Sequence, residues 1–253
     1  MEAVLAQKTG TYFEQPANGA LRKYFSWVWV HRLPKEINTP INVVPDGHID
    51  LQWVDEAFRI AGPDHEVHTE AVKPGGIIVG FRFHPGIANE WLGVSAAEML
   101  HSRVSLAEIS SRRAKQLADS VGGAEDVARL SNCVKTAMQR CDEVPSTNAA
   151  RMNQAFRMMS AGVPQNRHVI SCLTEALGMS ERTLRRRFDE AFGYGPQTLA
   201  RVLRYQRFLE LTRTEPRATV AELAFAAGYA DQAHLARESG RMTGMVPSKL
   251  LRV

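Results

Sequence analysis

The spacing of apolar residues changes partway along the chain and divides it into two kinds of structure. In the first 85 residues, Phe25, Trp27 and Trp29 stand at every second position, and a turn sequence at 45–47 leads into a run at 49–54. A third run, at 77–83, follows Pro-Gly-Gly. Short runs of period two bounded by Gly and Pro are typical of β-strands. The pattern therefore predicts a small β structure at the N-terminus.

From Ile87 onward the apolar spacing lengthens to three and four residues, which predicts amphipathic helices as far as residue 141. Residues 142–148 are polar, contain a proline and have no apolar period, so they predict a linker. Everything beyond them is patterned as helix. We therefore expect a two-domain α+β protein, with a β-rich domain and trailing helices at 1–141 and an all-α domain at 149–253.

The helical part contains an internal repeat. Shifting it by 51 residues aligns seven identical residues in a 19-residue overlap, among them Leu184 with Leu235 and Gly193 with Gly244. The repeated unit reads as a helix, a glycine, a short turn and a second, capped helix. This is the arrangement of a helix-turn-helix, and it predicts two such units, at about 168–192 and 219–243.

Each part of the repeated unit has a physical reason. Gly178 can adopt the left-handed backbone that ends a first helix, and Ser180 is placed to cap the second. In that second helix Leu184 and Phe188 face inward, which leaves three arginines on the opposite face: Arg182, Arg185 and Arg186. The second unit repeats the signals with Gly228 and Asp231. A helix that is apolar behind and rich in donors in front suits a DNA major groove.

Charge supports the same division. Up to Ala150 the chain has 15 Lys and Arg against 18 Asp and Glu, a net charge of −3; beyond it the counts are 16 and 9, a net charge of +7. Of these 16 cations 15 are arginines, whose planar fork suits phosphates and guanine edges. Charge alone fits a solvated basic surface equally well, so it makes nucleic acid a candidate partner and no more.

Composition excludes several classes. With 44% hydrophobic and 23% charged residues in 253, the chain is typical of a globular protein and not of a fibrous or disordered one. Three cysteines are too few and too scattered for a disulfide framework or a four-ligand zinc site, which favours a reducing compartment. The apolar runs are far shorter than the roughly 20 residues needed to span a bilayer, and no secretory signal precedes them. We expect a cytoplasmic protein without membrane contact.

The C-terminal motifs resemble the DNA-binding domain of AraC/XylS-type transcription regulators. The resemblance is carried by Leu177-Gly178-Met179-Ser180, Leu184-Arg185-Arg186-Arg187-Phe188, Gly228-Tyr229, His234-Leu235 and Gly244-x-x-Pro247. It spans about 100 residues and implies seven helices, with two helix-turn-helix units on a rigid connecting helix that bind double-stranded promoter DNA in successive major grooves. The base-contacting positions that it implies are Arg182, Arg185 and Arg186 in the first unit and Gln232, Ala233, Ala236 and Arg237 in the second.

The second unit departs from the family pattern. Leu235 and Ser239 stand where aromatic core residues are usual, and Gly240 lies in mid-helix, at a cost of about 1 kcal/mol relative to alanine. Ala233 and Ala236 can contact at most thymine methyl groups. We therefore expect a looser second unit with weaker sequence readout.

The N-terminal half resembles, less specifically, the cupin-like sensor domains that precede such DNA-binding domains. The stretches concerned include Trp29 with His31, residues 45–51, 79–86 and 91–94. The resemblance implies binding of a small-molecule effector, formation of a homodimer, or both. The candidate effector-binding residues are His31, His48, Asp50 and Arg82.

Other chemistry is weakly signalled. His65, Glu66, His68 and Glu70 have a spacing that could supply metal ligands, but Pro63-Asp64 beside them is typical of a surface turn and no cupin metal motif is complete. Asp46, His48 and Asp50 could form an acid/base cluster, although paired polar residues after a turn are usually structural. No phosphate-binding glycine loop or nucleophile elbow occurs. We expect neither a metal nor a cofactor, and no enzymatic activity.

Three interpretations remain. The one best supported is a sequence-specific transcription regulator, either an activator or a repressor, that is controlled by an effector in the N-terminal domain. The first alternative is a metal-dependent enzyme of cupin type fused to a DNA-binding domain. The second is a constitutive DNA-binding protein whose first domain serves only for assembly.

Overall fold

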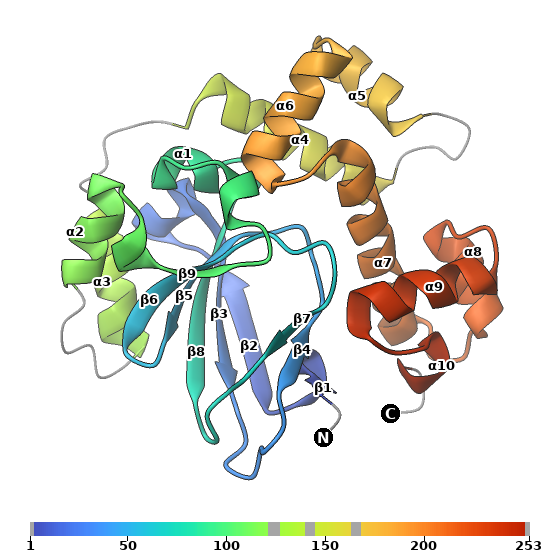
Figure 1. The fold of residues 1–253 in the computed structure, drawn as a ribbon, viewed down its shortest axis with the longest axis horizontal. Coiled ribbons are helices and arrows are strands. Elements are labelled where there is room, and N and C mark those ends of the chain that lie inside the picture. The colour runs from blue at the N-terminus through green and yellow to red at the C-terminus, as the bar shows by residue number, and fades with distance from the viewer. Residues whose placement is uncertain (1–2, 121–126, 140–144, 163–167, 251–253) are drawn as a thin grey trace.

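The computed structural model describes residues 3–120, 127–139, 145–162 and 168–250. Figure 1 shows a twisted sheet with helices at one side and a group of helices at the other that forms the C-terminal half of the chain. The predicted order, a β-rich part followed by a helical part, is confirmed.

Two sheets build the N-terminal part. The larger has six antiparallel strands in the order β2-β3-β8-β5-β6-β9 and the smaller has the order β1-β4-β7. The bounds are β1 Val4–Leu5, β2 Thr11–Pro16, β3 Phe25–Arg32, β4 Ile41–Val43, β5 Asp50–Val54, β6 Ala57–Ala61, β7 His68–Glu70, β8 Ile77–Phe83 and β9 Arg103–Ser105. The runs noted at 49–54 and 77–83 are β5 and β8.

The six-stranded sheet has two chemically different faces, because neighbouring side chains on a strand point to opposite sides. One face carries Leu51, Phe81 and Phe83, which are fully buried in a core shared with α1 Ala88–Leu92, α2 Arg112–Ser120 and α3 Val127–Gln139. The other face carries charged and aromatic side chains of β2, β3, β5, β6 and β8. This polar face, and not the apolar one, is turned toward the C-terminal half.

The described C-terminal residues form seven helices, the number that the resemblance implies. They are α4 Thr147–Ala161, α5 Val169–Leu177, α6 Glu181–Phe192, α7 Pro196–Thr214, α8 Val220–Ala227, α9 Gln232–Thr243 and α10 Pro247–Leu250. Among the described residues, no helix combines the length and the apolar character that crossing a membrane requires.

The predicted helix ends follow from local chemistry. Gly178 and Gly228 end α5 and α8 with left-handed backbones, at φ 60° and 91°. Ser180 accepts a hydrogen bond from Thr183 N at the start of α6, and Asp231 accepts one from His234 N at the start of α9. Both predicted helix-turn-helix units are thus formed, by α5 with α6 and by α8 with α9.

The predicted linker needs a correction at its end. Thr147 and Asn148 were expected in the linker, but they form the first turn of α4, because the Ser146 side chain accepts hydrogen bonds from Asn148 N and Ala149 N and so caps that helix. Ser146 also hydrogen-bonds Glu90, which joins the cap to the N-terminal part. Residues 142–144 of the expected linker lie outside the described residues.

The two parts of the chain pack directly against each other. Leu5 and Val44, from the N-terminal part, belong to the apolar core of the second helix-turn-helix unit. Asn42 Nδ2 donates to Thr243 O (3.2 Å) and Val67 N donates to Arg241 O (2.9 Å), both near the end of α9. The first unit is contacted as well, because Pro63 and Ala96 lie against Gly193 at the end of α6.

Candidate functional site

The outer face of α6 is a row of exposed arginines. Arg182, Arg185 and Arg186 are all exposed, while Leu184 and Phe188 on the opposite face are fully buried. Arg185 Nη2 lies 2.7 Å from Glu181 Oε1 and Arg186 Nη1 lies 3.1 Å from Glu190 Oε1, with the two arginine side chains 49% and 59% exposed. Such surface pairs are worth well under about 1 kcal/mol. Both guanidinium groups are therefore available to a phosphate or a base edge.

The corresponding face of α9 carries little charge. Gln232, Ala233 and Arg237 are exposed and Ala236 is half-buried, so Arg237 is the one cation among these four positions. Behind it, Ser239 is fully buried, and its hydroxyl lies 3.0 Å from Tyr205 Oη and donates to Met245 O at 2.7 Å. Hydrogen bonds thus close the core at the position where the sequence departs from an aromatic residue.

Helix α7 joins the two units. Pro196 is in its first turn, where a missing N–H costs nothing, and its buried face carries Leu199, Val202 and Phe208. Leu199 packs in the core of the first unit, and Val202 and Phe208 pack in that of the second. One continuous helix therefore fixes the distance between the two groove-reading helices.

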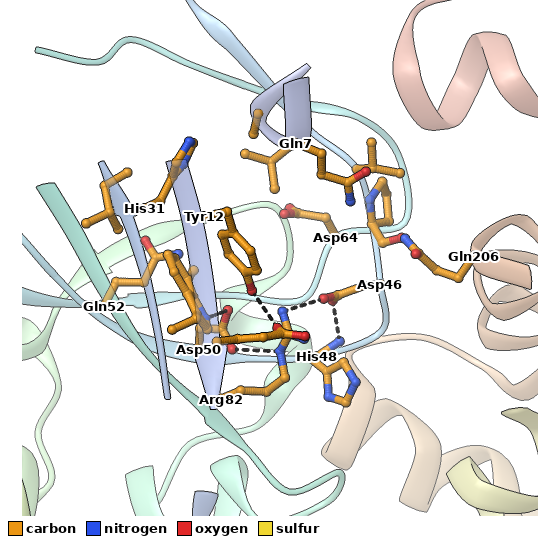
Figure 2. Close-up of a pocket in the computed structure, with 18 of the residues that line it drawn as sticks. Gln7, Tyr12, His31, Asp46, His48, Asp50, Gln52, Asp64, Arg82 and Gln206 are labelled. Carbon is orange, nitrogen blue, oxygen red and sulfur yellow. Dashed lines mark hydrogen bonds and ion pairs between the residues drawn. The ribbon is translucent and has the colours of Figure 1, made fainter. Parts of the chain in front are cut away.

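A cavity of about 510 Å³ lies between the polar face of the large sheet, the small sheet and helices α4 and α7. Figure 2 shows its centre, where Tyr12, Asp46, Asp50 and Arg82 point toward one another. Phe156 of α4 and Gln206 of α7 belong to its wall. The cavity is thus shared by the two halves of the chain.

Arg82 is the centre of a charge cluster at one end of the cavity. Its Nη2 lies 2.8 Å from Asp46 Oδ2 and its Nε lies 3.4 Å from Asp50 Oδ1. Trp29 Nε1 donates to the other oxygen of Asp50 at 3.1 Å. The indole can lie there because its neighbour in the sheet is Gly80: a Cβ at position 80 would be 2.0 Å from the Trp29 ring.

Burial and charge shift the pKa values in this cluster. Burial acts to raise the pKa of Asp46, but Arg82 and His48 lower it below its ordinary value. Burial, together with Asp46, raises the pKa of Asp50 in spite of the neighbouring Arg82. Burial lowers the pKa of His48 to about 4, and Arg82 acts in the same direction. His48 is therefore uncharged at neutral pH.

A second charge cluster lines the other end of the cavity. Arg59 forms an ion pair with Glu70 and donates from Nε to Gln52 Oε1 at 2.9 Å. Arg103 Nη2 donates to Asp64 Oδ2, also at 2.9 Å. These arginines are thus held by acidic side chains of the cavity wall.

The loop before β5 connects the cavity to the C-terminal helices. Gln206 Nε2 of α7 donates to Pro45 O at 2.6 Å, and the His48 ring packs on Phe156 of α4 with centroids 4.8 Å apart. Gly47, at φ 81°, lets the loop lie flush, because a Cβ there would be 2.8 Å from Leu199. Asp46, on this loop, is ion-paired with Arg82 in the sheet. The loop is therefore a direct connection from the cavity to α7.

The structure brings all four candidate effector-binding residues to this cavity, since His31, His48, Asp50 and Arg82 line it. Within the described residues, no group of three or more His, Cys, Asp or Glu side chains is placed to hold a metal ion, and this includes the stretch at 65–70. Tyr12, Glu14, Phe156 and Gln206 also line the cavity and were not predicted from the sequence. The alternation of Tyr12 and Glu14 could have indicated a strand, but no local signal links residues 156 and 206 to the sheet.

Two helix-turn-helix units in one half, and a cavity that this half shares with the β-rich half, are typical of the class of two-domain DNA-binding proteins. Two family models match the chain: residues 173–252 match one described as a helix-turn-helix domain, and residues 14–105 match a domain of unknown function, DUF6597. The first is of the AraC type, which confirms the resemblance to AraC/XylS-type regulators for this part of the chain.

No curated protein matches the chain. Among solved structures, the crystal structure of ToxT from Vibrio cholerae O395 is similar at 12% identity and a TM-score of 0.47, covering 88% of this chain and 95% of that one. The unsaturated fatty acid bound wild-type ToxT from Vibrio cholerae strain SCE256 is similar at 11% identity and a TM-score of 0.45, covering 95% and 93%.

Proposed function

We propose that this protein is a sequence-specific DNA-binding transcription regulator whose DNA binding is controlled by a small molecule in the cavity that the N-terminal part shares with α4 and α7. One observation carries the proposal: two helix-turn-helix units, joined by a single helix, with an exposed row of arginines on α6. We propose the same division of labour as the sequence indicates, with sensing in residues 1–141 and DNA binding in residues 149–253.

In this proposal the two units read successive major grooves, about 34 Å apart along one face of the duplex. Arg182, Arg185 and Arg186 contact bases in the first groove. The second is read by Gln232, Ala233, Ala236 and Arg237, which offer fewer donors. Because a bidentate arginine discriminates guanine by about 1–3 kcal/mol, most of the sequence preference belongs to the first half-site.

The proposed control uses the loop at 45–48. The effector lies against His31, His48, Asp50 and Arg82, and the Asp46–Arg82 ion pair and the Gln206–Pro45 hydrogen bond transmit its presence to α7. An effector that shifts the loop moves α7 relative to the N-terminal part, and so changes the contacts of that part with the ends of α6 and α9. Such a coupling requires the effector to bind one arrangement of the loop better than another.

Selection of bound sequences from random duplex DNA by the full-length protein tests the proposal. The expected result is a site with two elements one helical turn apart, the first better defined than the second. Arg185→Ala should relax the preference at one position of the first element, at a cost of about 1–3 kcal/mol.

Arg187→Ala is the matched control, because it removes the same charge from a less exposed position of the same helix. The affinity should also fall steeply with salt, with a log-log slope of about 0.9 per phosphate contacted. Selection of no consensus, or an affinity that does not depend on salt, contradicts the proposed function.

A further inference from the structure

Resting on the proposed function, we propose that the effector is an organic cation, a small molecule with a protonated amine that is bound by the carboxylates and aromatic rings of the cavity. The charges, the aromatic rings and the ion pairs of the cavity wall support this inference.

The first reason is the balance of charge. Arg59, Arg82 and Arg103 are each ion-paired within the wall, and Arg213 is exposed at the rim. Against these four arginines the cavity is lined by five carboxylates: Glu14, Asp46, Asp50, Asp64 and Glu70. At the Arg82 end, Asp46 and Asp50 share one guanidinium group, and the exposed Glu14, which accepts a hydrogen bond from Tyr12 Oη at 2.8 Å, also lines the cavity, so that carboxyl groups outnumber cations at this end.

The second reason is the aromatic lining next to that charge. The Tyr12 ring lies 5.9 Å from the Trp29 ring and 6.2 Å from the His31 ring, and all three residues line the cavity. In Figure 2 the Tyr12 side chain points toward the Asp50 and Arg82 side chains. Faces of aromatic rings attract ammonium groups, most strongly where water is excluded. Rings and carboxylates together thus fit an ammonium group better than either does alone.

An anionic effector would meet the opposite situation. To bind a carboxylate, Arg82 has to release Asp46 or Asp50, and the released carboxylate loses its cation and keeps only the hydrogen bond from His48 N or from Trp29 Nε1. Breaking a buried ion pair in this way is strongly unfavourable. The arginine that the sequence suggested as a partner for a carboxylate ligand is therefore already occupied by two carboxylates of the chain.

Binding of matched compounds to the full-length protein tests the inference. Each set keeps one carbon skeleton and varies the end group: tyramine, 4-hydroxyphenylacetate and 4-(2-hydroxyethyl)phenol in one set, and pentylamine, valerate and pentanol in another. Isothermal titration calorimetry at neutral pH measures affinity, and Trp29 in the wall provides a fluorescence readout. In at least one set the amine should bind about tenfold more tightly than the alcohol and more tightly still than the acid.

The variant Glu14→Gln removes one negative charge from the rim with little change of shape, and it should weaken amine binding about tenfold. Glu36→Gln removes the same charge from an exposed position outside the cavity and should leave the affinity unchanged. Unchanged thermal midpoints of both variants establish that they are folded.

Preference for the acids or alcohols, equal binding within each set, or no binding of either amine at millimolar concentration overturns the inference, as does an equal effect of the two variants. Selection of bound DNA, done on the same preparation without added compound, separates the two proposals. A DNA consensus without amine binding leaves the proposed function standing and removes this inference. Amine binding without a DNA consensus removes the proposed function and leaves standing the binding of an organic cation in the cavity.

Discussion

Single residues decide the shape of the cavity wall. The Trp29 indole lies across Gly80 of the neighbouring strand and donates to Asp50, which in turn is paired with Arg82. Because the indole occupies the space where a Cβ would be, the absence of a side chain at position 80 is a condition for this chain of contacts.

Gly80→Ala should therefore destabilise the protein by about 2–4 kcal/mol, since the new methyl group displaces a buried indole and breaks its hydrogen bond. Urea unfolding measures the change. Gly240→Ala is the matched control: Gly240 lies in α9 with nothing within 4 Å of the new Cβ, so the same substitution should raise stability by up to about 1 kcal/mol. Destabilisation of equal size at both positions would contradict this account.

His48 should make stability depend on pH. Burial lowers its pKa from 6.5 to about 4 in the folded chain, so between these values the unfolded chain binds the additional proton. The free energy of unfolding then falls as the pH is lowered through this window. Between pH 7 and pH 5 the wild type should lose about 2 kcal/mol more than His48→Gln. Urea unfolding at both pH values gives the comparison, and parallel losses in the two proteins would exclude the role of His48.

At the scale of elements, α7 belongs to three structures at once. It supplies core residues to both helix-turn-helix units and a wall of the cavity, and Gln206 ties it to the loop at 45–48. The loop and the helix are in contact because Pro45 is buried there and its carbonyl has a donor in Gln206.

Gln206→Met should cost about 1–3 kcal/mol of stability, because it leaves the Pro45 carbonyl buried without its donor. Gln197→Met, at an exposed position of the same helix, should change stability by less than about 0.5 kcal/mol. Equilibrium unfolding in urea measures both variants. If they behave alike, the hydrogen bond between the loop and α7 contributes nothing to stability.

At the scale of the whole molecule, the N-terminal part holds the carboxyl ends of both groove-reading helices. Ser95 Oγ donates to Asp189 O on α6 at 3.5 Å, and Asn42 Nδ2 and Val67 N donate to carbonyls at the end of α9. Thr69 Oγ1 in turn donates to Asn42 Oδ1, so the contact with α9 is part of the small sheet. The orientation of the two units therefore depends on the N-terminal part as well as on α7.

Asn42→Ala should loosen this contact, and the amide of Val67, which donates to Arg241 O, should then exchange its hydrogen about tenfold faster or more. Hydrogen exchange followed by NMR measures the rate, with amides in the centre of β8 as the internal reference. Asn38→Ala, at an exposed position, should leave the rate unchanged. A Val67 rate that does not respond in folded Asn42→Ala would show that this contact does not hold α9.

The sequence by itself determined what depends on neighbours along the chain. Alternation indicated β3, β5 and β8, Gly178 and Gly228 marked helix ends, and Ser180 and Asp231 marked caps, because these signals act within a few residues. The start of α4 at Thr147 was not predicted, because its cap, Ser146, lies within a polar stretch that is typical of a linker.

Only the tertiary structure decided which of these elements meet. His31, His48, Asp50 and Arg82 are brought together by strand order, and Phe156 and Gln206 join them from helices more than 70 residues away along the chain. The sequence suggested Arg82 as a residue that binds a ligand, but in the structure it forms ion pairs with Asp46 and Asp50. Local pattern cannot report such pairing, because the energy of a buried charge depends on which distant groups the fold places beside it.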